Sequence, residues 1–290
     1  MATVQFRGKR RLTNWVGELA SWFTPDAECH PVAGARVNVS LNDRIGRLMW
    51  TGCYELELVA LLGQVLDPGM TFVDVGAQIG YFSVVAAALV GERGTVHSFE
   101  PAPDCFSRLV VNSRDYPWIT PHNSAVTDHT GEIAFYRSPN QSESGWGAIF
   151  NEDGERVRLS VRACTLDSWA SEQGIEKIDV LKIDVEGAEC RVLEGARAVI
   201  AKTRPILWVE ANEVCLSRDA KSVSLLLRRL TSWNYVTQGL WDPHSGSSEN
   251  IVAIPRERND LIERVKRAKL GLRPMMATDS VDANPVLSVR

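Results

Sequence analysis

Residues 71–83 read Thr-Phe-Val-Asp-Val-Gly-Ala-Gln-Ile-Gly-Tyr-Phe-Ser. An apolar run leads to Asp74, and an apolar helical pattern begins near Tyr81. Gly76 and Gly80 lie between them and favour a tight turn. Glycines let a backbone approach a ligand closely, and a helix N-terminus offers free N–H groups. The stretch therefore predicts a strand, a turn and a helix with a ligand site at the turn.

A carboxylate in the next predicted strand refines this interpretation. Glu100 ends the run Thr95-Val-His-Ser-Phe-Glu. In dinucleotide-binding folds, an acidic residue about 20 residues beyond the glycine turn binds the ribose hydroxyls. The simpler alternative is that Gly76 and Gly80 only make a sharp turn. The position of Glu100 favours a site for a nucleoside cofactor.

The glycine spacing excludes two common nucleotide sites. A dinucleotide site needs G-x-G-x-x-G, but position 78 is Gln and position 81 is Tyr. A Walker loop needs Lys directly after its last glycine, and none follows here. The remaining pattern, Asp-x-Gly-x-x-x-Gly, resembles motif I of class I S-adenosylmethionine-dependent methyltransferases. The resemblance implies that Asp74 and the backbone of 76–80 hold the methionine end of the cofactor, and that Glu100 holds the ribose.

Bulk properties narrow the class of protein. The formal net charge of −4 gives no general attraction to nucleic acid. No apolar run approaches the roughly 20 residues that a membrane span needs. Lys9-Arg-Arg is not followed by a continuous apolar segment, so a signal peptide is not expected. Six scattered cysteines without a C-x-x-C pair are typical of reduced thiols in a cytoplasmic protein.

Strand and helix patterns alternate over most of the chain, which predicts an α/β fold with a doubly wound, mostly parallel, seven-stranded sheet. The helical patterns cover 54–65, 80–90, 104–113, 188–201 and 221–231. The strand-like runs cover 71–75, 95–99, 119–126, 178–184, 206–210, 233–238 and 250–254.

Segments outside this alternation predict three regions, at residues 1–50, 51–256 and 257–290. In the first, 12–23 has apolar residues at helical spacing, and 32–50 reads as a β-hairpin with its turn at Asn42-Asp43. The 12–23 helix packs on its own domain or on a second copy, or else docks on a membrane surface.

A β-hairpin insertion is expected within 131–166. Its strands would be 132–137 and 156–164, on either side of a polar, Gly-rich loop at 138–154. Trp146 in that loop either closes over a substrate or lies in a mobile surface segment. The third region is a basic amphipathic helix, followed by a tail without periodicity.

A second motif lies at 178–189, Ile-Asp-Val-Leu-Lys-Ile-Asp-Val-Glu-Gly-Ala-Glu. In an extended strand, Lys182, Asp184 and Glu186 would project to one side. Charged side chains are rarely buried unless they are paired, and this row lies at the carboxyl end of a predicted central strand. The motif is therefore either part of a ligand site or a structural set of ion pairs at the strand end.

Together, these motifs resemble the FkbM family of methyltransferases over roughly residues 50–254. The matching segments are Tyr54-Glu55, Asp-Val-Gly-Ala-x-Ile-Gly-Tyr at 74–81, Phe-Glu-Pro at 99–101, Thr-Leu-Asp at 165–167, Leu-Lys-Ile-Asp-Val-Glu-Gly-Ala-Glu at 181–189 and Arg-Pro-Ile-Leu at 204–207. One departure is Gln78, where the family usually has Asn. The resemblance implies methylation of a hydroxyl on a sugar, polyketide or other specialised metabolite.

By the same resemblance, the expected cofactor is S-adenosyl-L-methionine. The residues expected to contact it are Asp74, Gly76, Ala77, Gln78, Gly80, Tyr81, Ser83, Glu100, Ser124, Ala125, Asp128 and Asp184. For Asp128 an alternative is a turn or cap role, because Thr130-Gly131 follows it.

Removal of a proton from an acceptor hydroxyl requires a general base or a metal ion. The catalytic candidates are Asp184, Glu186, Lys182, Glu210 and His244. The acids could also bind Mg²⁺ through oxygen ligands, but no metal site is favoured. The expected partner is a small hydroxylated acceptor, and a homo-oligomer through the N-terminal helix is an option. The rival hypotheses are a macromolecular methyltransferase of the same fold and a non-catalytic assembly partner.

Overall fold

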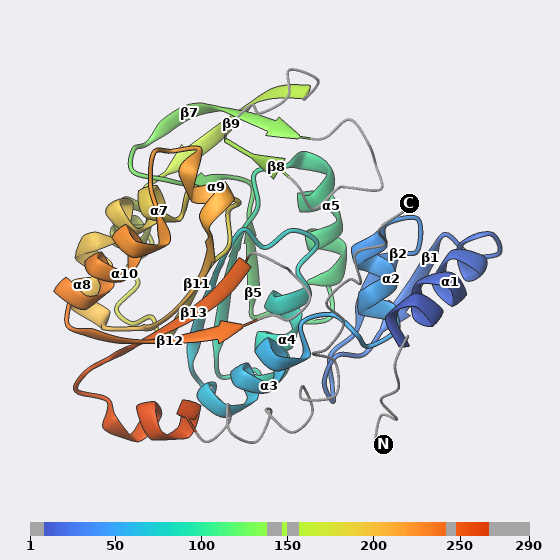
Figure 1. Cartoon of the computed structure of the whole chain (residues 1–290), viewed down its shortest axis with the longest axis horizontal. Helices are drawn as coiled ribbons and strands as arrows, with labels where there is room; N and C mark the ends of the chain where they lie inside the picture. The colour runs from blue at the N-terminus through green and yellow to red at the C-terminus, as the bar shows by residue number, and fades with distance from the viewer. Residues whose placement is uncertain (1–8, 138–146, 150–156, 242–247, 267–290) are drawn as a thin grey trace, which may run out of the picture.

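The computed structural model of this chain describes residues 9–137, 147–149, 157–241 and 248–266. Its central sheet comprises β3 (Thr71–Val75), β4 (Thr95–Phe99), β5 (Ile119–His122), β10 (Val180–Ile183), β11 (Ile206–Asn212), β12 (Tyr235–Trp241) and β13 (Ser248–Pro255). The strand order is β12-β13-β11-β10-β3-β4-β5 (Figure 1). Strands from β11 to β5 pair in parallel, and β13 is antiparallel to β11 and β12. The predicted mostly parallel, seven-stranded α/β fold is confirmed.

Helices cover both faces of this sheet (Figure 1). One face packs against α3 (Leu56–Val65), α4 (Tyr81–Val90) and a helix at 259–266, and α5 (Pro103–Asn112) lies on the same side. The other face packs against α6 (Leu166–Glu172), α7 (Glu189–Gly195), α8 (Arg197–Thr203) and α10 (Val223–Ser232). A short helix, α9 (Glu213–Ser217), follows β11 directly. No helix within these described ranges is both long and apolar enough to span a bilayer.

Alternate residues of the central strands belong to different cores. Phe72 packs in the cluster with α4, whereas its neighbour Val73 packs in the cluster with α7 and α8. Trp208 and Leu207 divide between the two clusters in the same way. Successive side chains of a strand point to opposite faces, so both faces must be apolar when both are covered. This explains the continuous apolar runs in the sequence.

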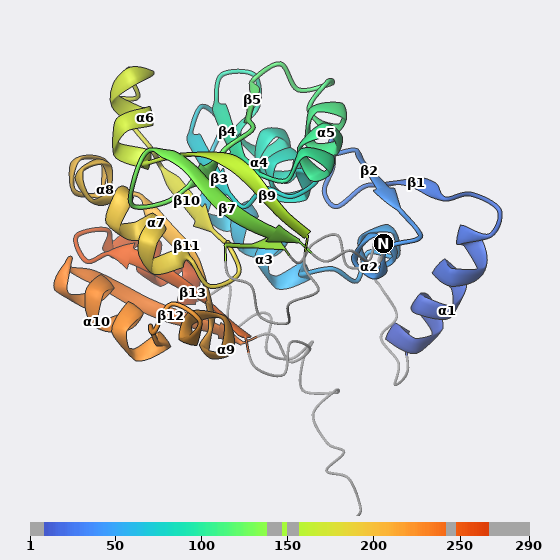
Figure 2. The ribbon, with the colours of Figure 1, turned by 90° about the horizontal axis from the view of Figure 1, so that it is seen from above.

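A second sheet covers one end of the first (Figures 1 and 2). It has the order β6-β9-β7-β8, with β6 (Ala125–Val126), β7 (Gly131–Arg137), β8 (Gly147–Ala148) and β9 (Val157–Cys164). β7 and β9 are antiparallel and form the expected inserted hairpin. The single strand predicted at 119–126 is wrong: β5 belongs to the first sheet and β6 to the second. Trp146 and most of the 138–154 loop lie outside the described residues.

The N-terminal region contains α1 (Lys9–Ser21), β1 (Asp26–Cys29), β2 (Val37–Ser40) and α2 (Arg44–Trp50). The hairpin predicted over 32–50 is wrong in its extent, because β2 pairs with the earlier β1 and the later part is helical. Asp43 is not in a hairpin turn. Its Oδ1 accepts from the N–H of Ile45 and caps α2. Asp is common both as a helix N-cap and in turns, so the local sequence could not show which of the two structures Asp43 forms.

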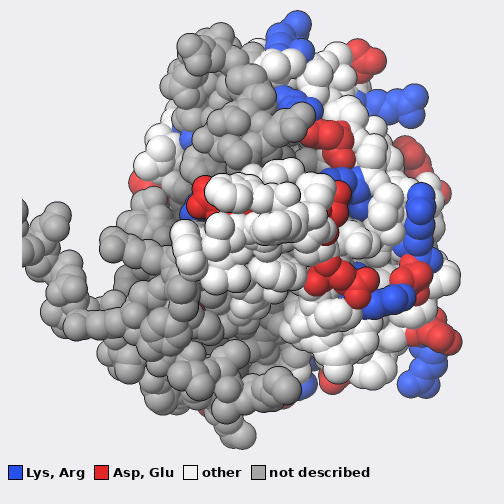
Figure 3. Space-filling model, turned by 90° about the vertical axis from the view of Figure 1, so that its right-hand side faces the viewer, with Lys and Arg blue, Asp and Glu red and all other residues white. Residues whose placement is uncertain are grey.

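One face of α1 is exposed. Gly17 of α1 lies against Arg47 of α2, and Ala20 packs on the core behind them. Trp15, Trp22 and Phe23 are all more than half exposed, so most of the predicted apolar stripe points to solvent. Figure 3 views this side of the molecule and shows broad surface without charged side chains, bordered by acidic and basic groups.

Two further predictions need correction. The helix expected over 188–201 is divided at Ala196 into α7 and α8. At this break, the backbone of Gly195 packs directly against Thr127, since a Cβ added to Gly195 would lie 1.9 Å from the carbonyl oxygen of Thr127. Helical periodicity continues through such a break because both helices bury their apolar faces against the same sheet. The short helices α2, α6 and α9 were not predicted, since five to seven residues give little periodicity.

Candidate functional site

A pocket opens where β3, β4 and β10 end. Because these strands are parallel, their carboxyl ends meet at one edge, which is where open α/β sheets bind ligands. The second sheet and the N-terminal region supply the remaining walls. The lining residues are Ile45, Met49, Tyr54, Val75, Gly76, Ala77, Gln78, Tyr81, Phe82, Phe99, Glu100, Pro101, Ala102, Asp104, Cys105, Ser124, Ala125, Val126, Thr127, Phe135, Arg137, Ile149, Lys182, Asp184, Val185, Glu186 and Ala188.

The glycine turn after β3 lies directly against β10. Gly76 has φ 83°, and a Cβ added there would lie 1.8 Å from the carbonyl oxygen of Asp184. The N–H groups of Gly76 and Ala77 both donate to the carbonyl oxygen of Phe99. These two hydrogen bonds therefore fix the turn on β4. The N–H groups of Gly76 and Ala77 are used in this way, and the turn lines the pocket with backbone that a ligand can approach closely. Gln78 adopts φ 51°, a conformation that is rare without glycine and is found at functional sites.

Glu100 faces the pocket from the end of β4. Its Oε2 accepts from the N–H of Gln78 at 2.8 Å, and its Oε1 accepts from the N–H of Ala102 at 2.8 Å. Burial raises the pKa of Glu100 to about 7, although these two hydrogen bonds act against the rise. Each carboxylate oxygen has two acceptor positions, so both oxygens can still accept from hydroxyl groups of a ligand.

Beneath the pocket lies a buried polar network centred on Lys182. Its Nζ lies 3.3 Å from Oδ1 of Asp74 and 3.2 Å from Oδ2 of Asp184. Burial lowers the pKa of Lys182, but the charges of Asp184 and Asp74 outweigh burial and raise it above the ordinary value. Asp74 also accepts from the hydroxyl of Ser83 at 2.7 Å, and Ser83 accepts from Ser98. A buried charge with these partners holds the ends of β3 and β10 together.

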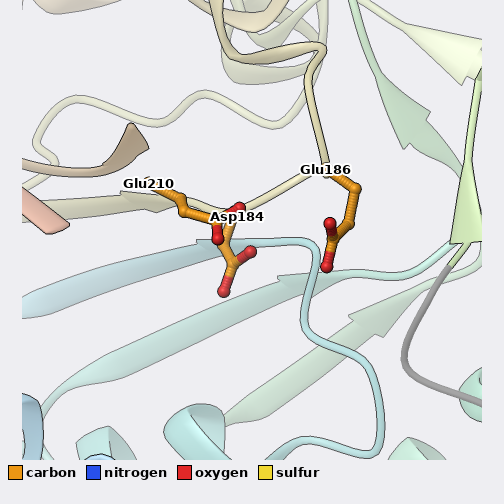
Figure 4. A group of neighbouring side chains, drawn as sticks. All are labelled: Asp184, Glu186 and Glu210. Carbon is orange, nitrogen blue, oxygen red and sulfur yellow. The ribbon is translucent and has the colours of Figure 1, made fainter. Parts of the chain in front are cut away.

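Three carboxylates meet beside this network, from Asp184, Glu186 and Glu210. One oxygen of each lies within 4.8 Å of the others (Figure 4). Lys182 of β10 pairs with Trp208 of β11, so two residues further on Asp184 lies beside Glu210. Burial and then the charge of Asp184 raise the pKa of Glu186 to about 7 and that of Glu210 well above its ordinary value.

Glu186 reaches this group by a route that the strand pattern did not predict. β10 ends at Ile183, and Glu186 has φ 54° in the turn that follows. The expectation that Lys182, Asp184 and Glu186 form one extended row is therefore wrong for Glu186. Glu189 holds this turn, because its Oε1 accepts from the N–H groups of Val185 and Gly187.

Most of the residues expected to contact a cofactor lie in this pocket. Asp74, Gly80, Ser83 and Asp128 are not among the residues that line it. Asp74 and Ser83 are completely buried, and Asp128 accepts from Thr127 and His129. Gly80 lies against Leu109 of α5. His244 lies outside the described residues.

The sequence motifs did not identify the individual residues that form several walls of the pocket. Ile45 and Met49 come from the N-terminal region, Tyr54 from the segment between α2 and α3, and Phe135 and Arg137 from the inserted sheet. Arg137 forms an ion pair with Asp104 at 2.9 Å. The strained φ of 41° at Glu55, directly after Tyr54, is a feature of the fold that no sequence pattern reveals.

Comparison with known proteins gives the family. Residues 74–237 match the model of the methyltransferase FkbM domain. This chain belongs to the FkbM methyltransferase family. The matched FkbM segment contains Glu100, Lys182, Asp184 and Glu186, whereas Tyr54 precedes it.

Three relatives resemble the chain over different lengths. It is 30% identical over 252 residues to the AMB antimetabolite synthetase AmbE of Pseudomonas aeruginosa, covering 72% of this chain and 11% of AmbE. It is 27% identical over 174 residues to the hexuronic acid methyltransferase AglP of Haloferax volcanii, covering 60% of this chain and 67% of AglP. It is 34% identical over 164 residues to the 31-O-demethyl-FK506 methyltransferase FkbM of Streptomyces tacrolimicus, covering 46% of this chain and 62% of that protein. The chain thus corresponds to a small part of AmbE and to about two thirds of the other two.

Proposed function

We propose that this FkbM-family chain transfers a methyl group from S-adenosyl-L-methionine to a hydroxyl of a small molecule, such as a sugar, glycoside or polyketide. The observation that carries the proposal is one pocket that joins the glycine turn and Glu100 on one side to Asp184 and Glu186 on the other. The first side suits a nucleoside, and the second suits a hydroxyl that must lose a proton.

The cofactor would lie across the edge of β3 and β4. The carboxylate of Glu100 would accept from the two ribose hydroxyls, and Ala77 and Gln78 would contact the ligand at the turn. Ser124, Ala125 and Thr127 line the pocket where adenine would lie. Asp74 and Ser83 act indirectly in this arrangement, because they fix Lys182 and the turn from below.

The reaction is an in-line displacement on the methyl carbon. An oxygen–carbon bond forms as the sulfur–carbon bond breaks, and the products are a methyl ether, S-adenosylhomocysteine and a proton. Asp184 and Glu186 would orient the acceptor hydroxyl, and one of them would accept the proton. Alignment of the two reactants accounts for up to about 7–11 kcal/mol of a barrier in favourable cases. Lys182 does not touch the reactants in this scheme and positions Asp184.

The acceptor would enter between the N-terminal region and the inserted sheet. Ile45 and Met49 of the N-terminal region are apolar, whereas Arg137 of the inserted sheet is charged and pairs with Asp104 of α5. AglP is named for a hexuronic acid and FkbM for an O-linked position of FK506. These names support a hydroxylated small molecule as the acceptor class.

A transfer assay tests the proposal. Purified protein is incubated with methyl-labelled S-adenosylmethionine and mixed sugars, glycosides and polyketides, and the products are identified by mass. Asp184→Asn should lower kcat about 100-fold or more while S-adenosylhomocysteine binds within twofold of wild type. The exposed Asp67→Asn is the matched control and should leave both unchanged. Label found only in protein or RNA would favour the alternative that the chain methylates a macromolecule. If calorimetry detected no binding of S-adenosylhomocysteine, the alternative of a non-catalytic assembly partner would be favoured.

A further inference from the structure

The acid cluster of Asp184, Glu186 and Glu210 has more negative charge than the proposed reaction needs. A single carboxylate is enough to accept a proton, yet three lie at the ends of β10 and β11 with oxygens within 4.8 Å of one another (Figure 4). The parallel register of the two strands brings Asp184 and Glu210 side by side. Like charges in this position repel each other unless a proton or a cation neutralises them.

The cation nearest to the cluster is already shared. Nζ of Lys182 lies between Asp74 and Asp184, at 3.3 and 3.2 Å. Its charge is therefore divided between two carboxylates on one side of the cluster. Arg218 donates to the backbone carbonyl of Glu186 at 3.3 Å, and its charge also acts on the Glu186 carboxyl, where it lowers the pKa. None of these contacts is with the side chain of Glu210.

Glu210 gives an independent sign of a missing partner. Its Oε2 is buried and has no hydrogen-bond partner among the described residues. A buried polar atom without a partner is uncommon in native structures, and a buried charge without one is costly. Glu210 points toward Asp184 (Figure 4).

We propose that Asp184, Glu186 and Glu210 bind a hard divalent cation, Mg²⁺ or Mn²⁺. Carboxylate oxygens are the ligands that such ions prefer, at about 2.0–2.1 Å from Mg²⁺, so two ligand oxygens on one ion lie up to about 4.2 Å apart. The three oxygens lie within 4.8 Å of one another, so a small movement of the side chains would bring them onto one ion. The site would deepen the proposed function, on which its catalytic role rests, although its existence does not depend on methyl transfer.

The cation would act on the acceptor. Asp184 and Glu186 line the pocket, so an ion that they bind can also take an oxygen of the acceptor as a ligand. A coordinated hydroxyl has a lowered pKa and gives up its proton more easily, to a carboxylate oxygen or to water. The oxygen then attacks the methyl carbon, and sulfur keeps the electron pair of the broken bond. The ion itself is neither oxidised nor reduced.

The test measures Mn²⁺ binding directly by electron paramagnetic resonance and by calorimetry, with metal-free protein saturated with S-adenosylhomocysteine. Wild type should bind one Mn²⁺, with competition by Mg²⁺. Glu210→Gln should weaken Mn²⁺ binding at least tenfold. The matched control is Glu92→Gln, which removes one charge from an exposed turn and should change Mn²⁺ binding less than twofold. S-adenosylhomocysteine binding reports that each variant is folded, because Glu210 does not line the cofactor pocket.

The outcomes separate the two proposals. No Mn²⁺ binding at 10 mM to a protein that binds S-adenosylhomocysteine, or equal losses in Glu210→Gln and Glu92→Gln, would overturn the metal site and leave the proposed function standing. Mn²⁺ binding without any cofactor binding would support the metal site and overturn the function. Undiminished methyl transfer in excess chelator would show that the ion does not act on the acceptor.

Discussion

At the scale of single residues, the site depends on carboxylates whose surroundings give them different roles. Asp74 and Glu100 end neighbouring parallel strands, yet Asp74 is completely buried against Lys182 and Ser83, whereas Glu100 faces the pocket. Both were expected to contact the cofactor directly. Both side chains are buried, and only the position of each relative to the pocket distinguishes a residue that can touch a ligand from one that fixes the frame.

The pH dependence of cofactor binding should reveal the role of Glu100. Its pKa in the free protein is raised to about 7, chiefly by burial, and the ribose hydroxyls need an ionised acceptor. The affinity for S-adenosylhomocysteine should therefore fall as pH drops below about 7, by up to about tenfold per pH unit. Calorimetry between pH 5.5 and 8.5 measures this, and Glu100→Gln should be weaker by about 10–100-fold and lack the dependence.

The same pKa shift has the opposite effect on folding. Glu100 is held with a raised pKa in the folded chain, so between about 4.5 and 7 the folded state binds more protons than the unfolded state. Its contribution favours folding at low pH and is lost as pH rises through about 7.

The role of Glu100 in binding has its own test. A Glu100→Gln variant that keeps the wild-type pH profile of S-adenosylhomocysteine binding would contradict that role.

Gly76→Ala should damage both stability and the site. A Cβ at this position would meet the carbonyl oxygen of Asp184 at 1.8 Å, and φ 83° is strained for alanine. We expect a loss of about 1–3 kcal/mol or more in unfolding free energy, with weakened S-adenosylhomocysteine binding. Denaturant unfolding and calorimetry measure the two effects. Gly63→Ala in α3 is the control, because its Cβ would meet nothing within 4 Å and it should be neutral or stabilising.

At the scale of elements, one motif of the family has a structural role. Thr165-Leu-Asp begins α6: Thr165 accepts from the N–H of Ser168, and Leu166 is completely buried. Asp167 then reaches α8, where it accepts from the N–H groups of Ala198 and Val199. A carboxylate at a helix N-terminus satisfies donors that have no partner within the helix. The motif thus joins two helices on the face of the sheet that covers Val73 and Leu181.

Asp167→Ala should therefore destabilise the fold without affecting the site. Loss of the two hydrogen bonds at the start of α8 should lower the unfolding free energy by about 1–2 kcal/mol. Binding of S-adenosylhomocysteine should stay within twofold of wild type, because neither helix lines the pocket. Denaturant unfolding and calorimetry on the same sample check both parts. A large loss of cofactor affinity with little loss of stability would place Asp167 in the site instead.

At the scale of the whole molecule, the pocket is assembled from parts that are distant in sequence. Met49 comes from the N-terminal region, Phe135 from the inserted sheet, and Glu100 and Asp184 from the FkbM domain. Cofactor binding should therefore stabilise the chain as a unit. A ligand at 100 times its Kd adds about 2.7 kcal/mol to the unfolding free energy.

We accordingly expect S-adenosylhomocysteine at that concentration to raise the Tm by about 4–5 °C, with one cooperative transition. Thermal unfolding followed by circular dichroism measures this shift. In Glu100→Gln at the same ligand concentration, the shift should be much smaller. A wild-type Tm that does not respond to the ligand would contradict cofactor binding.

The sequence by itself determined the α/β alternation, the glycine turn, the placement of Glu100 at a strand end and the acids after β10, because period-two and helical patterns and local turn chemistry are short-range properties. It also carried the family motifs. Only the tertiary structure decided that α7 and α8 are separate, that Asp74 is buried beneath the pocket while Glu100 faces it, and that Glu186 and Glu210 meet Asp184. Burial and convergence depend on how distant segments pack, and no local pattern contains that information.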